Sequence, residues 1–212
     1  MGKTKKPKAV KLIVGMLAKS QKLFNKAEEL FIKDLGPIDY KSCIIPFDYT
    51  DYYKKELGGP LKRNFISFKK TISPEKIAKI KLLTNTIEKK LSAGKKRQIN
   101  IDPGYVSDSK LIMATTKDYF HRIYLGHGIY AEVTLKWRKG GFEPFEWTYP
   151  DYRSKKYIGI LNTIRNNYMN PDFAIAKSAR RVDRLNPRGF NLARRGNPKQ
   201  ISNANFGMNH AK

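Results

Sequence analysis

An alternating segment near the middle of the chain is the strongest constraint on its fold. Between residues 129 and 137 apolar side chains take the odd positions and polar side chains take the even positions. A period of two predicts a β-strand with one buried face. The loop Gly126-His127-Gly128 joins this strand to a second segment at 118–125, so the two segments together predict a β-hairpin.

The charges of the hairpin indicate its register. If the loop closes symmetrically, the facing pairs are Tyr124 with Tyr130, Arg122 with Glu132, Phe120 with Thr134, and Asp118 with Lys136. Two opposite-charge pairs and one aromatic pair on the same face favour this register over a one-residue slip. We therefore expect even-numbered side chains to form a solvated ionic face and odd-numbered ones to line the interior. His121 then lies half-buried opposite Val133.

The net charge of +25, from 43 basic and 18 acidic residues, indicates the kind of partner. An anionic partner offsets self-repulsion of this size, which favours nucleic acid, an acidic membrane or a phosphorylated ligand. A solvated basic surface is the alternative. The apolar content of 40% is sufficient for a folded core.

Cysteine usage and hydropathy favour a cytoplasmic protein. The single cysteine, Cys43, excludes an intrachain disulfide, and its apolar neighbours predict a buried, inert thiol. The apolar run at 12–18 is too short for the core of a signal sequence or for a membrane span, so we expect no membrane association.

The order of the predicted elements indicates an α+β fold. We expect a basic arm at residues 1–8, a single domain at 9–170 and a basic, extended tail at 171–212. Helix caps, Gly-Pro stops and apolar periodicity predict strand 11–17, helix 20–35, strand 38–47, strand 61–68, helix 74–91 and strand 97–102. This βαββαβ order is the ferredoxin-like pattern, an antiparallel sheet with two helices on one face. A strand at 110–115, the hairpin and a closing helix at about 154–168 extend it.

Short segments of the first half resemble an RNA recognition motif. Residues 12–17 look like its first-strand signature and Phe65–Phe68 like the end of its third-strand signature. In that family, aromatic side chains on the central strands stack on bases. Here Ile13 and Arg63 occupy two of those positions, and only Phe65 is aromatic. The simpler interpretation is packing shared by members of a common fold, which by itself assigns no function.

Both termini carry basic residues that would neutralise phosphates. Residues 171–212 hold nine Lys or Arg against two Asp, with aromatic residues spaced between them. Extended arms of this composition commonly order along RNA, and an unselected disordered tail is the alternative. The expected RNA-binding residues are Lys3, Lys5, Lys6, Arg180, Arg181, Arg184, Arg188, Arg194 and Arg195.

A dense set of charges around the hairpin predicts a second kind of site. The candidates for acid–base chemistry are Asp102, Asp118, Glu132 and His127. The candidates for holding a phosphate or a nucleotide are Lys110, Arg122, Lys136, Tyr124 and Tyr130. Cross-strand ion pairing on a solvated face is the alternative. We expect no metal site; Asp48 and Asp51 are weak Mg²⁺ candidates that an Asx turn explains as well.

Six longer segments resemble one bacterial family. They are residues 46–53, 100–105, 114–119, 121–126, 128–135 and 147–154. These segments are similar to the bacterial family of unknown function numbered 4416, over about residues 8–168. The resemblance implies a bacterial, cytoplasmic single domain. Because the family has no assigned activity, the resemblance implies no catalytic residue and no cofactor. The tail beyond residue 170 is additional to the family pattern.

Two hypotheses of function follow. The first is an RNA-associated protein, ribosome-bound in its most specific form, that uses its sheet face and basic termini. RNA is favoured over DNA as its partner. The competing hypothesis is a protein or enzyme that binds a nucleotide or another phosphate ligand at a charged site around residues 118–136.

Overall fold

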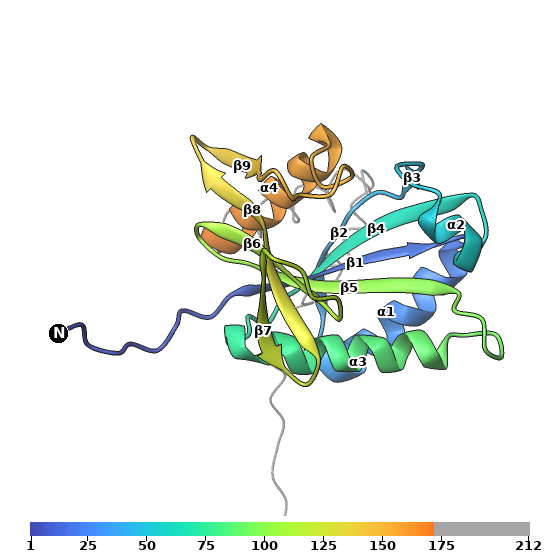
Figure 1. The fold of residues 1–212 in the computed structure, drawn as a ribbon, viewed down its shortest axis with the longest axis horizontal. Helices are drawn as coiled ribbons and strands as arrows, with labels where there is room; N and C mark the ends of the chain where they lie inside the picture. The colour runs from blue at the N-terminus through green and yellow to red at the C-terminus, as the bar shows by residue number, and fades with distance from the viewer. Residues whose placement is uncertain (172–212) are drawn as a thin grey trace, which may run out of the picture. The chain divides into compact units, whose positions relative to one another are not determined.

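The protein combines one antiparallel sheet with four α-helices in residues 1–171, which are the residues that this computed structural model describes (Figure 1). The strand order is β2-β4-β1-β5-β6-β8-β7, and in addition β3 pairs with β4 and β9 with β8. The strands are β1 (Lys11–Ala18), β2 (Ile38–Lys41), β3 (Ile45–Phe47), β4 (Leu61–Phe68), β5 (Ile99–Val106), β6 (Lys110–Thr115), β7 (Arg122–Gly126), β8 (Ile129–Arg138) and β9 (Gly141–Pro144). The helices are α1 (Gln21–Leu35), α2 (Tyr52–Leu57), α3 (Ile77–Lys90) and α4 (Lys155–Met169).

Strand β1 is buried along its whole length because helices cover both faces of the sheet. Side chains such as Leu12 and Val14 pack with residues of α1 and α3, while Ile13 on the opposite face packs with residues of α4. Figure 1 shows α1 and α3 on one side of β1 and α4 on the other. A strand covered on both faces has a nearly continuous apolar sequence, as β1 does.

Helix α4 provides the second covering layer. It begins where the Ser154 hydroxyl accepts a hydrogen bond from the backbone N–H of Tyr157. Its buried side chains recur at helical spacing and are Tyr157, Ile160, Leu161 and Ile164. The closing helix therefore lies where the sequence predicts it, with its apolar stripe against the sheet.

The sheet divides between β5 and β6. Only three residue pairs join these strands, at positions 104–106 of β5, so the first half of β5 has no neighbouring strand on that side within residues 1–171. Two side chains of α3 satisfy the exposed backbone instead. Glu88 accepts a hydrogen bond from the Ile101 N–H, and Lys81 Nζ donates to the Ile101 carbonyl at 2.8 Å. The division leaves a cleft between the two parts of the sheet.

The predicted strand at 38–47 is interrupted at Ser42, which separates β2 from β3. Asn64 Nδ2 donates to the Ser42 carbonyl at 2.9 Å, and the Ser42 hydroxyl accepts from the Phe65 N–H at 3.0 Å. These side-chain bonds replace part of the strand pairing and bend the chain. As a result Cys43 is exposed, so the prediction of a buried thiol is wrong.

The register of the hairpin is confirmed at its centre. Arg122 lies opposite Glu132, and Tyr124 lies opposite Tyr130. The two outer pairs are wrong, because β7 begins only at Arg122 after a turn in which the Arg122 N–H donates to the Tyr119 carbonyl. The later part of β8 pairs with β6 and β9, so Lys136 faces Lys110 and Glu143, and Asp118 is not part of a strand.

The prediction of a solvated even face and a buried odd face is also wrong. Glu132 and Thr134 on β8 are buried, while Ile123 on β7 is 66% exposed. Residues after β9 cover the even face: Trp147 Nε1 donates to the Val133 carbonyl, and the Thr148 hydroxyl donates to the Thr134 carbonyl. Strand β7 ends the sheet, and among the described residues 1–171 its odd side chains Ile123 and Leu125 remain exposed.

Gly104 permits the close approach of β6 to β5, and replacing this glycine tests whether the paired strands depend on the missing side chain. A Cβ at Gly104 would lie 2.4 Å from the Ile112 carbonyl oxygen and 2.5 Å from Met113 Sδ. We expect Gly104→Ala to lower the free energy of unfolding by about 1–3 kcal/mol, measured by urea denaturation. The control is Gly159→Ala in α4, where a Cβ meets nothing within 4 Å and a small stabilisation is expected. Equal stabilities of the two variants would contradict the account.

Candidate functional site

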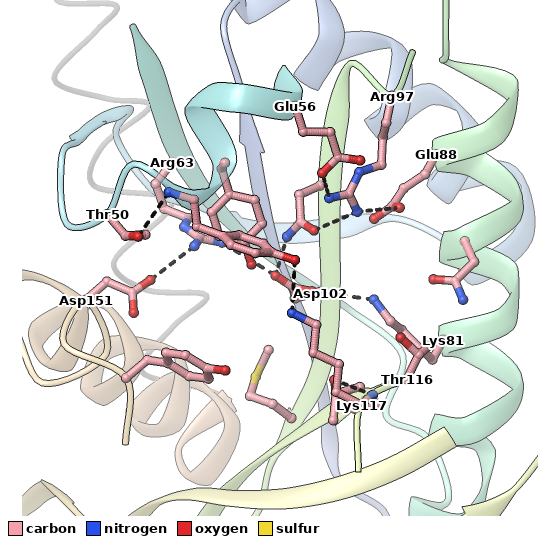
Figure 2. A pocket seen from close by; sticks show the side chains of 18 of the residues that line it. Thr50, Glu56, Arg63, Lys81, Glu88, Arg97, Asp102, Thr116, Lys117 and Asp151 are labelled. Atoms are coloured by element: carbon pink, nitrogen blue, oxygen red, sulfur yellow. Dashed lines mark hydrogen bonds and ion pairs between the residues drawn. The ribbon is translucent and has the colours of Figure 1, made fainter. Parts of the chain in front are cut away.

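The cleft where the sheet divides is a cavity of about 1090 Å³. Residues of β4, β5, β6, β8, α2 and α3 line it, together with residues 149–152 before α4. Figure 2 shows Asp102 near the centre of this cleft, with Arg63 and Asp151 on one side and Arg97 and Glu88 on the other. Charged groups from separate parts of the sequence therefore face a common space.

Arg63 is the central group of the site. Its side chain is 3% exposed. Nη2 donates to Asp151 Oδ2 at 3.1 Å, Nε donates to the Tyr157 hydroxyl at 3.3 Å, and the guanidinium lies over the ring of Phe47. Within residues 1–171, Nη1 has no hydrogen-bond partner, and it lies 3.9 Å from Asp102 Oδ2. A buried guanidinium thus keeps one donor unused in a residue that lines a cavity.

The local structure of β4 and β1 explains how an arginine fits here. Alternate residues of β4 point to the α4 side of the sheet, so Arg63 and Phe65 lie on one face. On the neighbouring strand β1, Gly15 has no side chain, so the side chains of Phe65, Tyr152 and Arg63 occupy the space above it. A Cβ at Gly15 would lie 3.1 Å from the Phe65 ring, 3.3 Å from the Tyr152 hydroxyl and 3.4 Å from Arg63 Nη1.

Asp102 connects the two basic groups of the cleft floor. Its side chain is 29% exposed, and Oδ1 accepts from Lys81 Nζ at 3.4 Å. Oδ2 accepts from Asn100 Nδ2 and faces Arg63. Arg63, Asp102 and Asp151 form what we call the Arg63 cluster. Of its two carboxylates, Asp102 is the one that is partly exposed and contacts two cations, Arg63 and Lys81. It is therefore available to accept a hydrogen bond or a proton from a ligand.

A second ionic network forms the wall beside α3. Arg97 donates to Glu88 Oε2 at 3.1 Å, to Asn100 Oδ1 at 3.0 Å and to Glu56 of α2 at 2.5 Å. This arginine ties together three elements, α2, α3 and β5. The network fixes the side of the cleft from which α2 approaches the sheet.

The opposite wall is centred on Glu132 of β8. Its Oε2 accepts from Arg122 Nε at 2.9 Å and lies 3.2 Å from His121 Nε2. Arg122 also reaches the Tyr149 hydroxyl at 3.5 Å. His121 therefore contacts Glu132 instead of facing Val133 as predicted, because the turn before β7 brings its ring to the even face.

Tyrosines form the mouth of the cleft. Tyr49, Tyr52 and Tyr149 line the cavity and are 39%, 60% and 52% exposed. Lys117 Nζ lies 4.7 Å from the centre of the Tyr52 ring, a cation–π distance. The mouth thus offers aromatic faces and the positive charge of Lys117, while the floor offers buried and partly buried charges.

Burial shifts the ionisation of several lining groups. Desolvation raises the pKa of Tyr157 to about 12 and raises the pKa of Asp151 despite the attraction of Arg63. Burial also raises the pKa of Glu88. For Arg63, burial lowers the pKa, but Tyr152, Tyr157 and Asp151 together raise it above its ordinary value. At neutral pH the buried tyrosines are therefore protonated donors beside a permanent cation.

The structure brings three of the predicted site residues into the cleft, namely Asp102, Arg122 and Glu132. Asp118 lines a separate shallow groove. The remaining candidates lie outside the cleft: Lys110 is exposed, Lys136 lies 4.0 Å from Glu143, Tyr124 packs on Tyr130, and His127 is exposed in the hairpin turn. Charge density along the hairpin was a partial guide, because only side chains near the division of the sheet converge.

The weaker predictions fall elsewhere. Within residues 1–171 there is no group of three or more His, Cys, Asp or Glu side chains suited to a metal ion, and Asp51 pairs with Lys54 at 2.6 Å. Lys3, Lys5 and Lys6 are exposed. The six arginines from Arg180 to Arg195 lie outside the described residues.

The sequence reasoning missed Arg63, Lys81 and Asp151. Arg63 drew attention only as a departure from the RNA recognition motif. The stronger signal was a charged residue inside an otherwise apolar strand, since such a residue needs a buried partner. The structure also shows that Ile13, Arg63 and Phe65 are buried, with Phe65 packed against Tyr152 and Tyr157. These three side chains therefore serve the packing of the domain, and none of them presents an exposed ring to a base.

Fold and site together define an α+β protein with a charged, tyrosine-rimmed cleft at the division of its sheet. The sequence matches the family described as Domain of unknown function (DUF4416) over residues 8–168, and the chain belongs to this family. No curated protein and no solved structure matches it. In the part of the chain that the structure describes, no helix is long and apolar enough to cross a membrane.

Removing Arg63 tests whether the buried charges depend on one another. Arg63→Met leaves Asp151 buried without its cation, so we expect the free energy of unfolding to fall by about 3–5 kcal/mol in urea denaturation. Glu143→Gln breaks the more exposed pair with Lys136 and serves as the control, with an expected change of about 0–1 kcal/mol. Similar stabilities of the two variants would show that the Arg63 cluster does not hold the structure together.

Proposed function

We propose that the protein binds a small ligand with a phosphate group in the central cleft, and that a nucleotide is the ligand class its lining fits best. The observation that carries this proposal is the buried guanidinium of Arg63, a cavity-lining side chain whose buried Nη1 makes no hydrogen bond within residues 1–171 and has an ion-pair contact with Asp102 Oδ2 at 3.9 Å. Arginine N–H groups bind phosphate oxygens strongly, and such a bond would satisfy the unused donor.

The mixture of charges supports a nucleotide over a simple anion. The cleft floor contains cations, Arg63 and Lys81, next to the partly exposed carboxylate of Asp102. A bare phosphate would be repelled by that carboxylate. A nucleotide offers phosphate oxygens to the cations and sugar hydroxyls or base N–H groups to Asp102, so it uses both kinds of group.

The tyrosines at the mouth support the aromatic part of the ligand. Tyr149 and Tyr52 are more than half exposed and line the same cavity as Arg63. Exposed aromatic side chains provide stacking surfaces for bases. The cleft volume of about 1090 Å³ is ample for a mononucleotide.

Two finer features complete the proposal. The partial strand order β2-β4-β1-β5, with α1 and α3 on one face, supports a ferredoxin-like topology for the first half of the domain, to which β6 to β9 are added.

An exposed free thiol at Cys43 supports a reducing, cytoplasmic location for the protein.

Calorimetric titration with AMP, ADP and pyrophosphate tests the proposal. We expect a nucleotide to bind more tightly than pyrophosphate, and we expect Lys117→Ala and Tyr149→Ala at the mouth each to weaken its binding by about tenfold. Lys70→Ala, an exposed lysine outside the cleft, is the matched control and leaves affinity unchanged. The proposal fails if no nucleotide binds, or if the mouth variants bind as the wild type does.

RNA association is a second candidate function, favoured by the net charge of +25 and by the exposed Lys3, Lys5 and Lys6. Because the face of Phe65 is buried, the basic surface and termini would supply the contacts. Lysines that contact phosphates release counterions, and this makes affinity depend on salt.

A salt titration with a single-stranded RNA measures this contribution. Each phosphate contact steepens the plot of log affinity against log salt by about 0.7, so alanine at Lys3, Lys5 and Lys6 should reduce the slope by up to about 2. Arginine at the same three positions keeps the charge and should keep the slope. If the alanine variant keeps the slope of the wild type, the N-terminal lysines do not contact the RNA.

A further inference from the structure

A shallow groove of about 440 Å³ lies next to the central cleft, and we call it the aromatic groove. Its lining residues are Lys117, Asp118, Tyr119, Phe120, His121, Arg122, Glu146, Trp147 and Tyr149. Three of them, Lys117, Arg122 and Tyr149, also line the central cleft. The two hollows therefore share a wall, and a ligand that passes Tyr149 leaves one hollow and enters the other.

The aromatic groove presents free aromatic surface on a stiff support. Phe120 is 75% exposed and Tyr119 is 59% exposed. Behind them, Trp147 is stacked between Phe145, at 4.7 Å between ring centres, and His121, at 5.3 Å. The Phe120 ring meets His121 edge to face at 4.8 Å. Because Trp147 already stacks on Phe145 and His121, its role is to support the groove. Phe120 is the ring whose exposed surface is available for contact with a ligand.

Exposed rings of this kind are costly unless something covers them. Phe120 and Tyr119 belong to none of the three hydrophobic clusters found in residues 1–171. The groove itself is lined by two basic residues, Lys117 and Arg122, and two acidic ones, Asp118 and Glu146, so the charge of the whole chain is the guide to its occupant. A chain of net charge +25 attracts a polyanion and repels a second copy of itself. A polyanion that also carries flat aromatic groups at regular spacing is a single-stranded nucleic acid.

We propose that the central cleft and the aromatic groove together bind the end of a single-stranded RNA, with the terminal nucleotide in the cleft and the adjoining base on Phe120. This inference rests on the proposed function, because it takes the cleft to be a nucleotide site. Lys117 lies on the shared wall, where the phosphate between the two nucleotides would pass. Asp102 on the cleft floor can accept a bond from a ribose 2′-hydroxyl, which distinguishes RNA from DNA.

Affinity as a function of oligonucleotide length tests the inference. Fluorescence anisotropy competition with AMP and with oligoadenylates of two, three and six nucleotides would be measured on the full-length chain. We expect a gain of about tenfold or more from the first to the second nucleotide, because one base becomes stacked. The gain from each later nucleotide should be smaller, since further contacts are mainly electrostatic.

Phe120→Ala separates this inference from the proposed function. It should weaken binding of the dinucleotide by about tenfold and leave binding of AMP unchanged, since Phe120 does not line the cleft. Tyr124→Ala is the matched control, because Tyr124 is another exposed aromatic residue, 59% exposed, that lines neither hollow.

Each pattern of results has one meaning. Binding of AMP without any gain from a second nucleotide, or without any effect of Phe120→Ala, overturns the inference and leaves the nucleotide site in place. Equal binding of RNA and DNA dinucleotides overturns the role of the 2′-hydroxyl. If neither AMP nor any oligonucleotide responds to the mouth variants Lys117→Ala and Tyr149→Ala, the proposed function itself fails.

Discussion

The burial of the Arg63 charge is the constraint on which the rest of the structure depends. A guanidinium removed from water must find anionic and aromatic neighbours. Its neighbours come from separate parts of the chain, with Asp151 before α4, Tyr157 within α4, and Asp102 on β5. The position of α4, the missing side chain at Gly15 and the charged cleft are therefore consequences of one buried group.

The division of the sheet opens the cleft that Arg63 lines. If β6 continued along β5, a strand would fill the space that the cleft occupies. Because β5 pairs with β6 only from Gly104 onward and the strands are apart before it, the second part of the sheet carries Glu132 and Arg122 to the opposite wall. The same separation places the turn before β7 beside the mouth, so the aromatic groove adjoins the cleft. The fold and the geometry of the site thus have a common origin, which is the short pairing of β5 with β6 over only three residue pairs.

Local rules predicted local structure well and burial poorly. Alternation and charge pairing were sufficient to place Arg122 opposite Glu132, since both act between neighbouring strands. The same alternation could not show that residues 147 and 148 would cover the even face, because that contact joins elements through tertiary packing. Asp102 and Glu132 were predicted from charge density. Asp151 was not, because its role depends on Arg63, which is 88 positions away in the sequence.

The way in which α3 completes β5 has a consequence for how the family can diversify. Glu88 and Lys81 supply the hydrogen bonds that a neighbouring strand would otherwise make. At Ile101 the backbone of β5 is therefore satisfied without a neighbouring strand. Changes in the segment that follows β6 can widen or narrow the cleft while these bonds stay in place, whereas β6 itself contributes Leu111 and Met113 to the core. A scaffold of this kind allows ligand preference to evolve separately from foldability.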